Sequence, residues 1–443
     1  MTQPLSDPTP SPEPYESFES IDTESFDLED RQALRRVAGL ATELEDVTEV
    51  EYRQLRLERV VLVGVWTSGT VADAENSMTE LARLAETAGS QILDGVMQRR
   101  DRPDPATYLG SGKAKEVRDL VVSTGADTVV CDGELTPGQL RKLEEIVKVK
   151  VIDRTALILD IFAQHARSRE GKAQVELAQL QYMLPRLRGW GESMSRQAGG
   201  RVAGGGGIGT RGPGETKIET DRRRINTRIS RLRRQLGELG ATRATQRQER
   251  VRHEVPSVVL AGYTNAGKSS LLNRLTGAGV LVEDALFATL DPTVRRSQTP
   301  DGREYTLADT VGFVRHLPHQ LIEAFRSTLE EVADSDLVLH VVDGSDADPE
   351  GQIAAVREVL GEIDALHVPE LLVINKIDAA DEETQLRLKS LWPDAVFASA
   401  RTGTGIDAVR AAVEQRLPWP AIELTAVVPY ERGDLVARVH TVG

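Results

Sequence analysis

Apolar runs and amphipathic stretches alternate along residues 59 to 162 of this 443-residue chain. The strand-like runs are Val60–Val65, Ile92–Val96, Asp127–Val130 and Lys148–Ile152. The helix-like stretches are Ala74–Ala88, Ala114–Ser123 and Pro137–Ile146. Because strands that alternate with helices usually form parallel sheets, the pattern predicts a small α/β domain with a largely parallel sheet.

Two longer, more polar stretches follow, at residues 170 to 188 and 217 to 250. Their apolar positions are Leu177, Leu180 and Leu184 in the first, and Ile218, Ile225, Ile229, Leu232, Leu236 and Leu239 in the second. A spacing of three and four residues places such positions on one face of a helix. We therefore expect an antiparallel helical hairpin. The segment that joins its arms, residues 199 to 214, is too rich in glycine to form a regular element.

The segment Gly262–Ser269 lies between the apolar run Val258–Ala261 and the helix-like Leu271–Leu275. It fits the phosphate-loop pattern, in which glycines let backbone N–H groups turn toward phosphates and the next helix contributes its N-terminus. We expect Lys268 to reach the β- and γ-phosphates and Ser269 to bind Mg²⁺. Alone, the pattern also fits an ATPase or a chance match.

Three later segments come directly after strand-like runs: Asp309–Gly312, Asn375–Asp378 and Ser399–Arg401. The first resembles a γ-phosphate sensor, with Asp309 supporting Mg²⁺ and the Gly312 amide meeting the phosphate. Asp378 can accept two hydrogen bonds from guanine, whereas adenine offers no such pair of donors, so a carboxylate here discriminates between the bases. The backbone of the last segment is expected to contact the guanine oxygen. Each segment alone is an ordinary strand-end turn, but together and in this order they predict a GTP site.

The segment Leu286–Thr293 should supply the threonine that completes the Mg²⁺ shell. Thr289 is our choice and Thr293 the alternative, and for both the simpler interpretation is a loop-capping role. The predicted catalytic residues are Lys268, Thr289 and Gly312, and the predicted metal ligands are Ser269 and Thr289. The full predicted nucleotide-binding set is Gly262, Tyr263, Thr264, Asn265, Ala266, Gly267, Lys268, Ser269, Phe287, Ala288, Thr289, Leu290, Asp291, Asp309, Thr310, Val311, Gly312, Asn375, Lys376, Ile377, Asp378, Ser399, Ala400 and Arg401.

Phe313 stands where many small GTPases carry a glutamine that orients the attacking water. Because a phenyl ring cannot orient water, we expect slow hydrolysis that a partner stimulates. The nearby His316 and His319 are more simply solvated side chains than bases. Asn265 supports two hypotheses: it tolerates the backbone angles of the loop, or it helps to hold a K⁺ ion against the phosphates.

Charge is distributed unevenly in a chain whose formal net charge is −15. Residues 1 to 50 hold 13 acidic and 3 basic side chains, the composition of a disordered leader. Residues 186 to 252 hold 17 basic and 6 acidic side chains around the Gly-rich segment. Arginines at the base of a flexible loop suit a phosphate backbone, and structured RNA is favoured because few aromatics interleave. The predicted RNA contacts are Arg196, Arg201, Arg211, Arg222, Arg223 and Arg224, in a region also flanked by Arg186 and Arg188; the alternative is a plain linker with solvated helix faces.

Other features narrow the class of protein. No apolar run approaches the length of a transmembrane helix, and the acidic start does not resemble a signal peptide, so we expect a cytoplasmic protein, associated peripherally with ribosomes or membranes at most. The single Cys131 excludes an internal disulfide framework, and the scattered histidines give no zinc spacing. Tyr108–Lys113 resembles a phosphate loop superficially; a turn before a helix is the simpler interpretation, and ATP binding is the other.

Taken together, Gly204–Thr216 with Asp221–Arg224, Phe287–Thr293 and Asp309–His319 resemble the HflX family of translational GTPases, of the Obg-HflX group. The resemblance spans about residues 55 to 420. It implies an N-terminal α/β domain and a helical linker before the G domain, and binding to the large ribosomal subunit, where the Gly-rich loop and its arginines probe ribosomal RNA near the peptidyl-transferase region. Some members split ribosomes under stress, and some bind ATP as well.

The predicted organisation is an acidic leader (1–54), an N-terminal α/β domain (55–168), a basic helical hairpin (169–252), a P-loop G domain with a mostly parallel sheet and helices on both faces (253–420), and the start of a small C-terminal α/β domain (421–443). Short strands at Glu423–Pro429 and Leu435–His440 suggest the last of these, reduced or cut short. We expect a monomer that binds GTP and GDP and performs Mg²⁺-dependent GTP hydrolysis. The alternatives are an RNA-binding scaffold that senses nucleotide without much turnover, and a GTPase that acts on another RNA such as tRNA.

Overall fold

The computed structural model describes residues 59–187, 213–252, 255–277, 286–287, 289–290, 293–299, 301–315, 318–418 and 425–442. All of them belong to one compact unit, Gln54–Gly443. The predicted acidic leader lies outside the described residues, as do the Gly-rich segment and Arg188.

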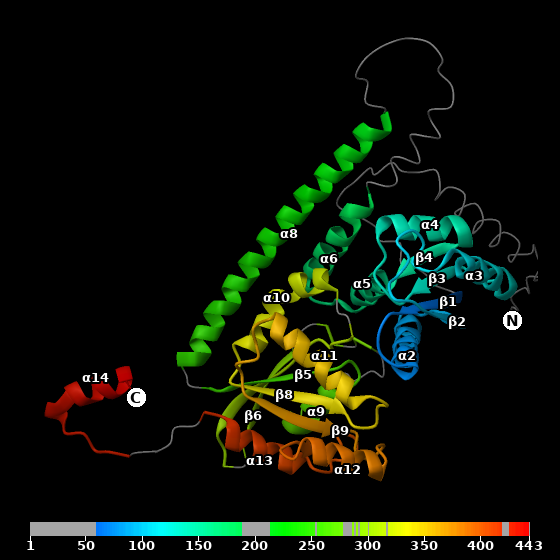
Figure 1. Cartoon of the computed structure of the whole chain (residues 1–443). Helices are drawn as coiled ribbons and strands as arrows, with labels where there is room; N and C mark the ends of the chain where they lie inside the picture. The colour runs from blue at the N-terminus through cyan, green and yellow to red at the C-terminus, as the bar shows by residue number, and fades with distance from the viewer. Residues whose placement is uncertain are drawn as a thin grey trace, which may run out of the picture. The chain divides into compact units, whose positions relative to one another are not determined.

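The N-terminal part is a four-stranded parallel sheet in the order β2-β1-β3-β4 (Figure 1). Its strands are β1 (Arg59–Trp66), β2 (Gln91–Arg99), β3 (Thr128–Cys131) and β4 (Lys150–Asp153). Its helices are α2 (Val71–Thr87), α3 (Ser111–Thr124), α4 (Pro137–Val147) and α5 (Arg154–His165). The alternation predicted from the sequence is confirmed.

Both faces of this sheet are buried because helices pack on each of them, and successive residues of β1 point to opposite faces. Val60 and Leu62 pack in one cluster with α2 and α5, whereas Val61 and Val63 pack in another with α3 and α4. Two of the helices begin at threonine capping boxes, at Thr70 and Thr136, which satisfy the first backbone N–H groups.

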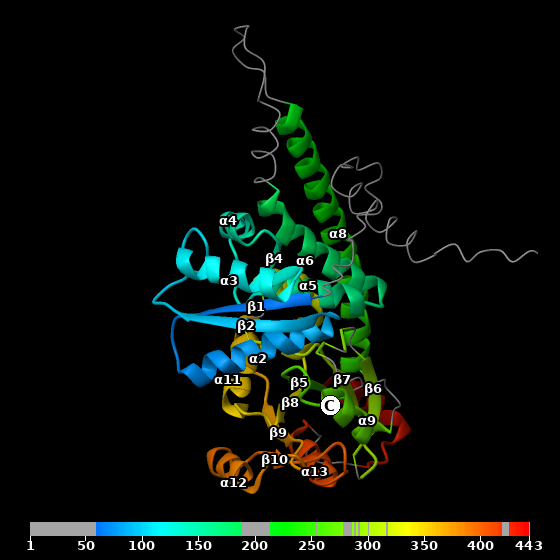
Figure 2. The same cartoon turned by 90° about the vertical axis from the view of Figure 1, so that its right-hand side faces the viewer.

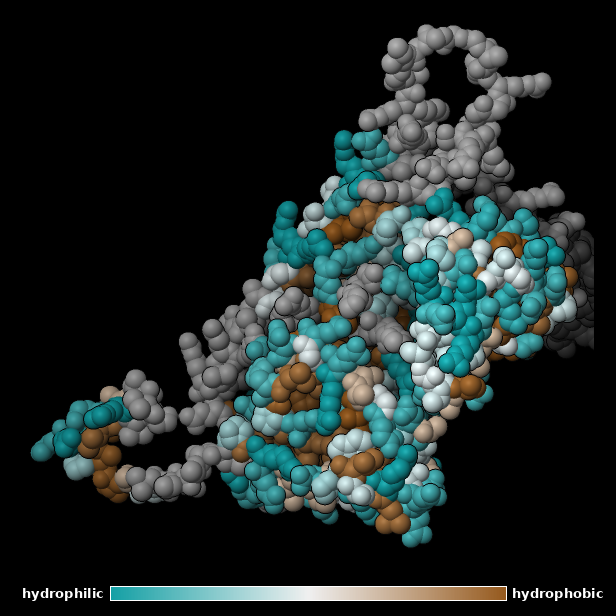
Figure 3. All heavy atoms as spheres, in the orientation of Figure 1, coloured by the Kyte–Doolittle hydropathy of each residue, from teal (hydrophilic) through white to brown (hydrophobic). Residues whose placement is uncertain are grey.

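The two long helices α6 (Arg169–Arg186) and α8 (Pro213–Arg252) lie side by side and run in opposite directions (Figures 1 and 2). Leucines of α6 share a buried cluster with Ile229, Leu232 and Leu236 of α8, and an ion pair joins Glu176 to Arg228 at 2.6 Å. Figure 3 shows mostly hydrophilic side chains on the visible part of α8, with hydrophobic ones gathered where it meets α6. The antiparallel pairing follows from the apolar stripes seen in the sequence.

The G domain contains a six-stranded sheet in the order β10-β9-β8-β5-β7-β6. Its strands are β5 (Ser257–Gly262), β6 (Thr293–Gln298), β7 (Glu304–Asp309), β8 (Leu337–Asp343), β9 (Glu370–Asn375) and β10 (Val396–Phe397). Only the β6–β7 pairing is antiparallel. Its helices are α9 (Lys268–Thr276), α10 (His319–Ala333), α11 (Pro349–Glu362), α12 (Glu382–Leu391) and α13 (Ile406–Arg416). Figure 2 shows α11 on one side of this sheet and α9 on the other.

Aromatic side chains join the N-terminal part to the G domain. Phe162 of α5 makes edge-to-face contacts with Phe287, at 4.6 Å between ring centroids, and with Phe325 of α10, at 5.4 Å. All three rings belong to the same buried cluster as β1 and β5. The two sheets therefore share one continuous hydrophobic core through α5.

The predicted strand at Leu435–His440 is wrong. A 3₁₀ turn (Tyr430–Arg432) leads into helix α14 (Gly433–Val442), and residues 425 to 429 form no regular element. Leu435, Val439 and Val442 recur at intervals of four and three, which is helical spacing. The apparent alternation of apolar and polar residues was too short to distinguish the strand period of two residues from the helix period of 3.6.

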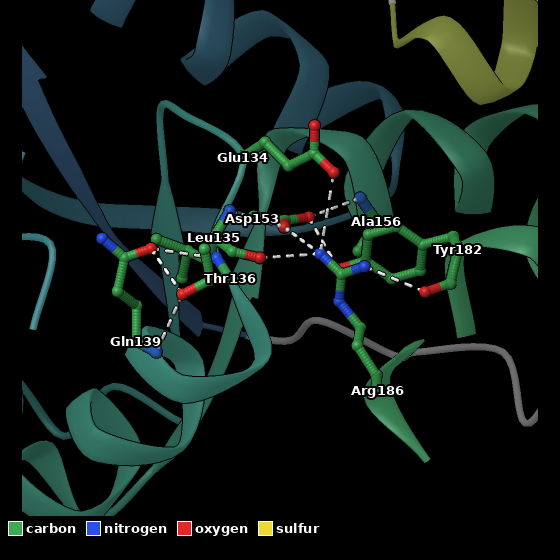
Figure 4. Close-up of polar contacts among 8 residues, drawn as sticks. All are labelled: Glu134, Leu135, Thr136, Gln139, Asp153, Ala156, Tyr182 and Arg186. Atoms are coloured by element: carbon green, nitrogen blue, oxygen red, sulfur yellow. Dashed lines mark hydrogen bonds and ion pairs between the residues drawn. The ribbon is translucent and has the colours of Figure 1, made fainter. Parts of the chain in front are cut away.

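Asp153, at the end of β4, is the centre of a buried polar network (Figure 4). Its carboxylate accepts hydrogen bonds from the backbone N–H groups of Leu135 and Ala156 at 3.0 and 2.8 Å and from the Tyr182 hydroxyl at 2.8 Å. The Arg186 guanidinium donates to the same carboxylate at 3.1 Å and lies 3.4 Å from the centre of the Tyr182 ring. Arg186 is thus engaged inside the protein, which corrects its placement among the RNA-facing arginines.

Replacing Asp153 with alanine should lower the free energy of unfolding by about 3–5 kcal/mol, because the largely buried Arg186 guanidinium loses its nearer charged partner. The urea-unfolding midpoint, followed by circular dichroism, measures this. Asp127→Ala is the matched control, since its ion pair with Arg59 is about half exposed and should contribute less than about 1 kcal/mol. Equal midpoints for the two variants would show that the network does not stabilise the fold.

Candidate guanine-nucleotide site

The phosphate loop connects the end of β5 to the start of α9 and is packed too closely for side chains at its glycines. A Cβ atom on Gly262 would lie 2.2 Å from the Val341 carbonyl oxygen, and one on Gly267, whose φ is +90°, would lie 2.3 Å from Asn375 Nδ2. Asn265 has a φ of +58° and is exposed. That angle supports the backbone interpretation of Asn265; the potassium hypothesis stays a prediction.

Lys268 is buried beneath the loop. Its ammonium group donates to the carbonyl oxygens of Gly262 at 3.1 Å and Tyr263 at 2.9 Å. Burial lowers the pKa of Lys268 to about 8, although the nearby Asp309 carboxylate opposes this shift. The loop thus holds a cationic side chain at the end of the central strand.

Three oxygen-bearing side chains from separate segments meet beside Lys268. The Ser269 hydroxyl donates to Asp309 at 2.5 Å and lies 2.8 Å from the Thr289 hydroxyl. Burial raises the pKa of Asp309, while Lys268 and the hydroxyl hydrogen bonds act in the opposite direction. Among the described residues, the buried Oδ1 atom of Asp309 has no hydrogen-bond partner. Two hydroxyls and a carboxylate suit a hard cation such as Mg²⁺, so these residues fit the metal that the motifs imply.

The structure thus brings Thr289 to Ser269. The alternative, Thr293, begins β6 and pairs with Asp309 along the β-ladder. Phe287 and Leu290 are buried beside Thr289, whereas Ala288 and Asp291 lie outside the described residues.

The segment after β7 lies directly against the phosphate loop. Thr264 N–H donates to the Phe313 carbonyl oxygen at 2.8 Å, and Phe313 N–H donates to the Gly262 carbonyl oxygen at 3.1 Å. A Cβ atom on Gly312 would lie 2.7 Å from Thr264 Cγ2 and 3.1 Å from Lys268 Nζ, so this position excludes a side chain. The Phe313 side chain is buried in the core and cannot reach a water at the loop.

The two predicted residues that precede Gly312 make contacts within the protein. Thr310 donates to the Leu260 carbonyl oxygen at 2.7 Å, and Val311 is buried. His316 and the side chain of His319 lie outside the described residues.

Asn375 joins the phosphate loop to the loop after β10. Its Nδ2 atom donates to the Ala266 carbonyl oxygen at 2.8 Å, and its Oδ1 atom accepts from Ala400 N–H at 3.0 Å. Both ends of the amide are therefore used within the protein. Within the segment Ser399–Arg401, whose backbone is expected to contact the guanine oxygen, the Ala400 N–H bonds to Asn375.

The carboxylate of Asp378 is held by the same loop. Ser399 Oγ donates to it at 2.5 Å, and Arg401 forms an ion pair with it. The hydrogen bond from Ser399 is the main reason that the pKa of Asp378 is lowered, so the group is an ionised acceptor at neutral pH. Lys376 forms an ion pair with Asp343 at 2.8 Å. Ile377 packs against a small buried hydrophobic cluster that includes Ile374 and Leu388.

Arg274 is a member of this site that the sequence does not reveal. From α9 it donates to the carbonyl oxygens of Ala400 at 2.7 Å and Arg401 at 2.6 Å. An arginine inside an ordinary helix carries no motif signal, and its partners follow more than a hundred residues later in the chain. It fixes the loop Ser399–Arg401 against the helix that follows the phosphate loop.

Only part of the predicted RNA-binding surface can be placed. Arg222, Arg223 and Arg224 are exposed on α8, with Arg224 at 3.8 Å from Asp221. Arg196, Arg201 and Arg211 lie outside the described residues.

In the N-terminal domain, Tyr108–Gly110 precede α3, and Ser111–Lys113 are the first residues of that helix. Gly110 caps that helix and Lys113 pairs with Glu116 at 2.7 Å. This matches the simpler interpretation of the segment, and ATP binding stays a prediction. None of the helices in the described part of the chain has the length and apolar character needed to cross a membrane.

Three family models match consecutive parts of the chain. They are described as the N-terminal region of a GTP-binding GTPase (residues 75–163), the middle region of the same kind of GTPase (165–250) and a 50S ribosome-binding GTPase (257–376). The third covers the phosphate loop and the Asp309 segment described above, and it ends just after Asn375.

Similar proteins are known along most of the chain. GTPase HflX of Lacrimispora saccharolytica is 48% identical over 402 residues, which cover 91% of this chain and 92% of that protein. GTPase HflX of Caldanaerobacter subterraneus is 46% identical over 379 residues (85% and 84%), and GTPase HflX of Escherichia coli is 45% identical over 386 residues (86% and 88%). With this likeness and the geometry of the site, the chain belongs to the HflX family of GTPases and is a P-loop GTP hydrolase.

Proposed function

We propose that this GTPase binds the large ribosomal subunit and hydrolyses GTP in response, as a factor for splitting or rescuing ribosomes under stress. The observation that carries the proposal is the complete hydroxyl and carboxylate cluster of Ser269, Thr289 and Asp309 beside a buried Phe313. The site can hold the nucleotide, but nothing at position 313 can orient water, so turnover depends on a partner.

The identity of the partner is supported by two observations. The family model that matches residues 257–376 describes a 50S ribosome-binding GTPase. Exposed Arg222, Arg223 and Arg224 also lie near the end of α8 that follows the Gly-rich segment, and exposed arginines suit a ribosomal RNA backbone. The proposed RNA contacts are these three together with Arg196, Arg201 and Arg211.

In the proposed mechanism, water attacks the γ-phosphorus of GTP, the bond to the β–γ bridging oxygen breaks, and GDP and phosphate leave. Lys268 and the Gly312 amide stabilise negative charge on the phosphate oxygens. Ser269 and Thr289 would hold Mg²⁺, with Asp309 supporting it, and such an ion would supply positive charge beside the phosphates. A K⁺ ion beside the exposed Asn265 is a second proposed cofactor.

Guanine is proposed to bind against Asp378, with Asn375 and the loop Ser399–Arg401 as its frame. Ser399 orients the carboxylate, so that both oxygens are set before the base arrives. Asn375 acts as a positioning residue, because each end of its amide bonds to one of the two loops and so joins them.

The selectivity of the base site is testable with Asp378→Asn. Replacing one acceptor oxygen with an amide donor should favour xanthine over guanine and reduce the preference for GTP by roughly 100-fold or more. Competition between GTP, XTP and ATP for a fluorescent GDP measures this. Asp407→Asn, on the exposed side of α13, is the control and should keep the preference of the original protein. Unchanged selectivity in Asp378→Asn would contradict the assignment.

The pKa of Lys268, at about 8, predicts a pH dependence of nucleotide binding. Above this pH the free protein carries a neutral amine and must take up a proton to bind phosphate. GDP affinity should therefore be constant at lower pH and fall by roughly tenfold per pH unit above it. Calorimetric titrations test this, with Lys268→Ala as the control that reports any dependence from the nucleotide itself. A constant affinity in the unmodified protein would rule out this titration.

The proposed function is tested by steady-state GTP hydrolysis, alone and with large subunits, small subunits or total tRNA. We expect slow turnover alone and strong stimulation confined to large subunits; 10³-fold or more is about the scale known when a partner completes such a site. Equal stimulation by tRNA would indicate a GTPase that acts on another RNA. No stimulation by any of them would favour the nucleotide-sensing scaffold.

A further inference from the structure

Tyr263, the second residue of the phosphate loop, connects three parts of the molecule. Its side chain is buried, and its hydroxyl donates a hydrogen bond to Glu80 of α2 at 2.6 Å. The same hydroxyl accepts a hydrogen bond from the backbone N–H of Arg315 at 2.7 Å. The phosphate-loop pattern accepts any residue at this position, so these contacts are particular to the tyrosine.

Glu80 is held in place by a chain of buried charges. One carboxylate oxygen pairs with Arg154, the first residue of α5, and the other accepts from Tyr263. Arg154 also pairs with Asp132 at 2.8 Å, and Asp132 in turn accepts from Ser77 at 2.5 Å. Because buried charges are stable only when paired in good geometry, this network fixes the position of Glu80.

Arg315 lies at the end of the segment that carries Gly312. This segment is tied to the phosphate loop by the two backbone hydrogen bonds of Phe313 and by the one from Arg315 N–H to Tyr263. The two bonds of Phe313 are contained in the G domain. The third bond, from Arg315, depends on the Tyr263 hydroxyl, which donates its own proton to Glu80 of the N-terminal domain.

We propose that Tyr263, oriented by Glu80, is a positioning residue for GTP hydrolysis. It acts through the backbone of Arg315, by holding the segment that presents the Gly312 amide to the γ-phosphate. The N-terminal domain thus contributes Glu80 and, behind it, Arg154 to the rate of a reaction that takes place in the G domain. Burial and the Glu80 carboxylate both raise the pKa of Tyr263, which keeps its hydroxyl protonated and able to donate.

Tyr263→Phe and Glu80→Gln test the proposal, alone and combined. Phenylalanine keeps the ring but has no hydroxyl, and glutamine offers one acceptor oxygen where the carboxylate serves two donors. Single-turnover hydrolysis of bound GTP should slow by roughly tenfold in each single variant. The double variant should be no slower than the singles, because both remove the same linkage. Affinities for GDP and GTP should stay within about twofold of the original, a change of less than about 0.5 kcal/mol.

Tyr305→Phe is the matched control, since Tyr305 is a buried tyrosine of the same domain on β7, near Ser297. It should hydrolyse GTP at the original rate. The proposal is overturned if Tyr263→Phe hydrolyses GTP normally, or if rate, affinity and melting temperature fall together in both single variants, as a purely structural role would give. Additive losses in the double variant would also contradict it, because Glu80 would then act without Tyr263. If Tyr263→Phe does not fold, Glu80→Gln alone tests the proposal. A slower hydrolysis rate with unchanged nucleotide affinity would support it, and an unchanged rate would overturn it.

Discussion

The parallel order of β7, β5, β8, β9 and β10 is the constraint on which the nucleotide site depends. Parallel strands end at the same edge of a sheet, and loops far apart in the sequence meet there. Asn375, at the end of β9, bonds to the phosphate loop with one end of its amide and to the loop Ser399–Arg401 with the other. The same edge brings Asp309, from the end of β7, to Ser269 at the start of α9. A change of strand order would separate all of these pairs at once.

Contacts between the N-terminal part and the G domain have two kinds of physical origin. Phe162 packs between Phe287 and Phe325, which is non-directional burial and stabilises the junction as a whole. The second kind is directional: an ion pair and hydrogen bonds connect Arg154, Glu80 and Tyr263. The last of these bonds is made to the backbone of the segment that follows Gly312. The first kind holds the parts together. The second kind couples the N-terminal domain to a particular step of the nucleotide cycle.

The sequence predicts those parts of the fold and the site that rest on local pattern. Strands ending in short polar motifs locate the phosphate loop and the segments of Asp309 and Asn375, because backbone geometry and nucleotide chemistry both restrict which residues can stand there. Side-chain pairings across long separations are not predictable in this way: Arg186 looked like a surface arginine and proved to be the partner of Asp153, and Arg274 carried no signal at all. Leu435–His440, which lies in α14, was predicted as a strand because so short a segment cannot distinguish a period of two from one of 3.6.

The segment from Val311 to Arg315 is expected to respond to the third phosphate of GTP while it is held at Tyr263. Hydrogen exchange of these backbone amides, measured by mass spectrometry with GDP and with a non-hydrolysable GTP analogue, tests this most directly. We expect slower exchange with the GTP analogue, because the Gly312 amide gains a phosphate partner and orders its neighbours. Identical exchange in the two nucleotide states would contradict it, since the segment would then not sense the γ-phosphate.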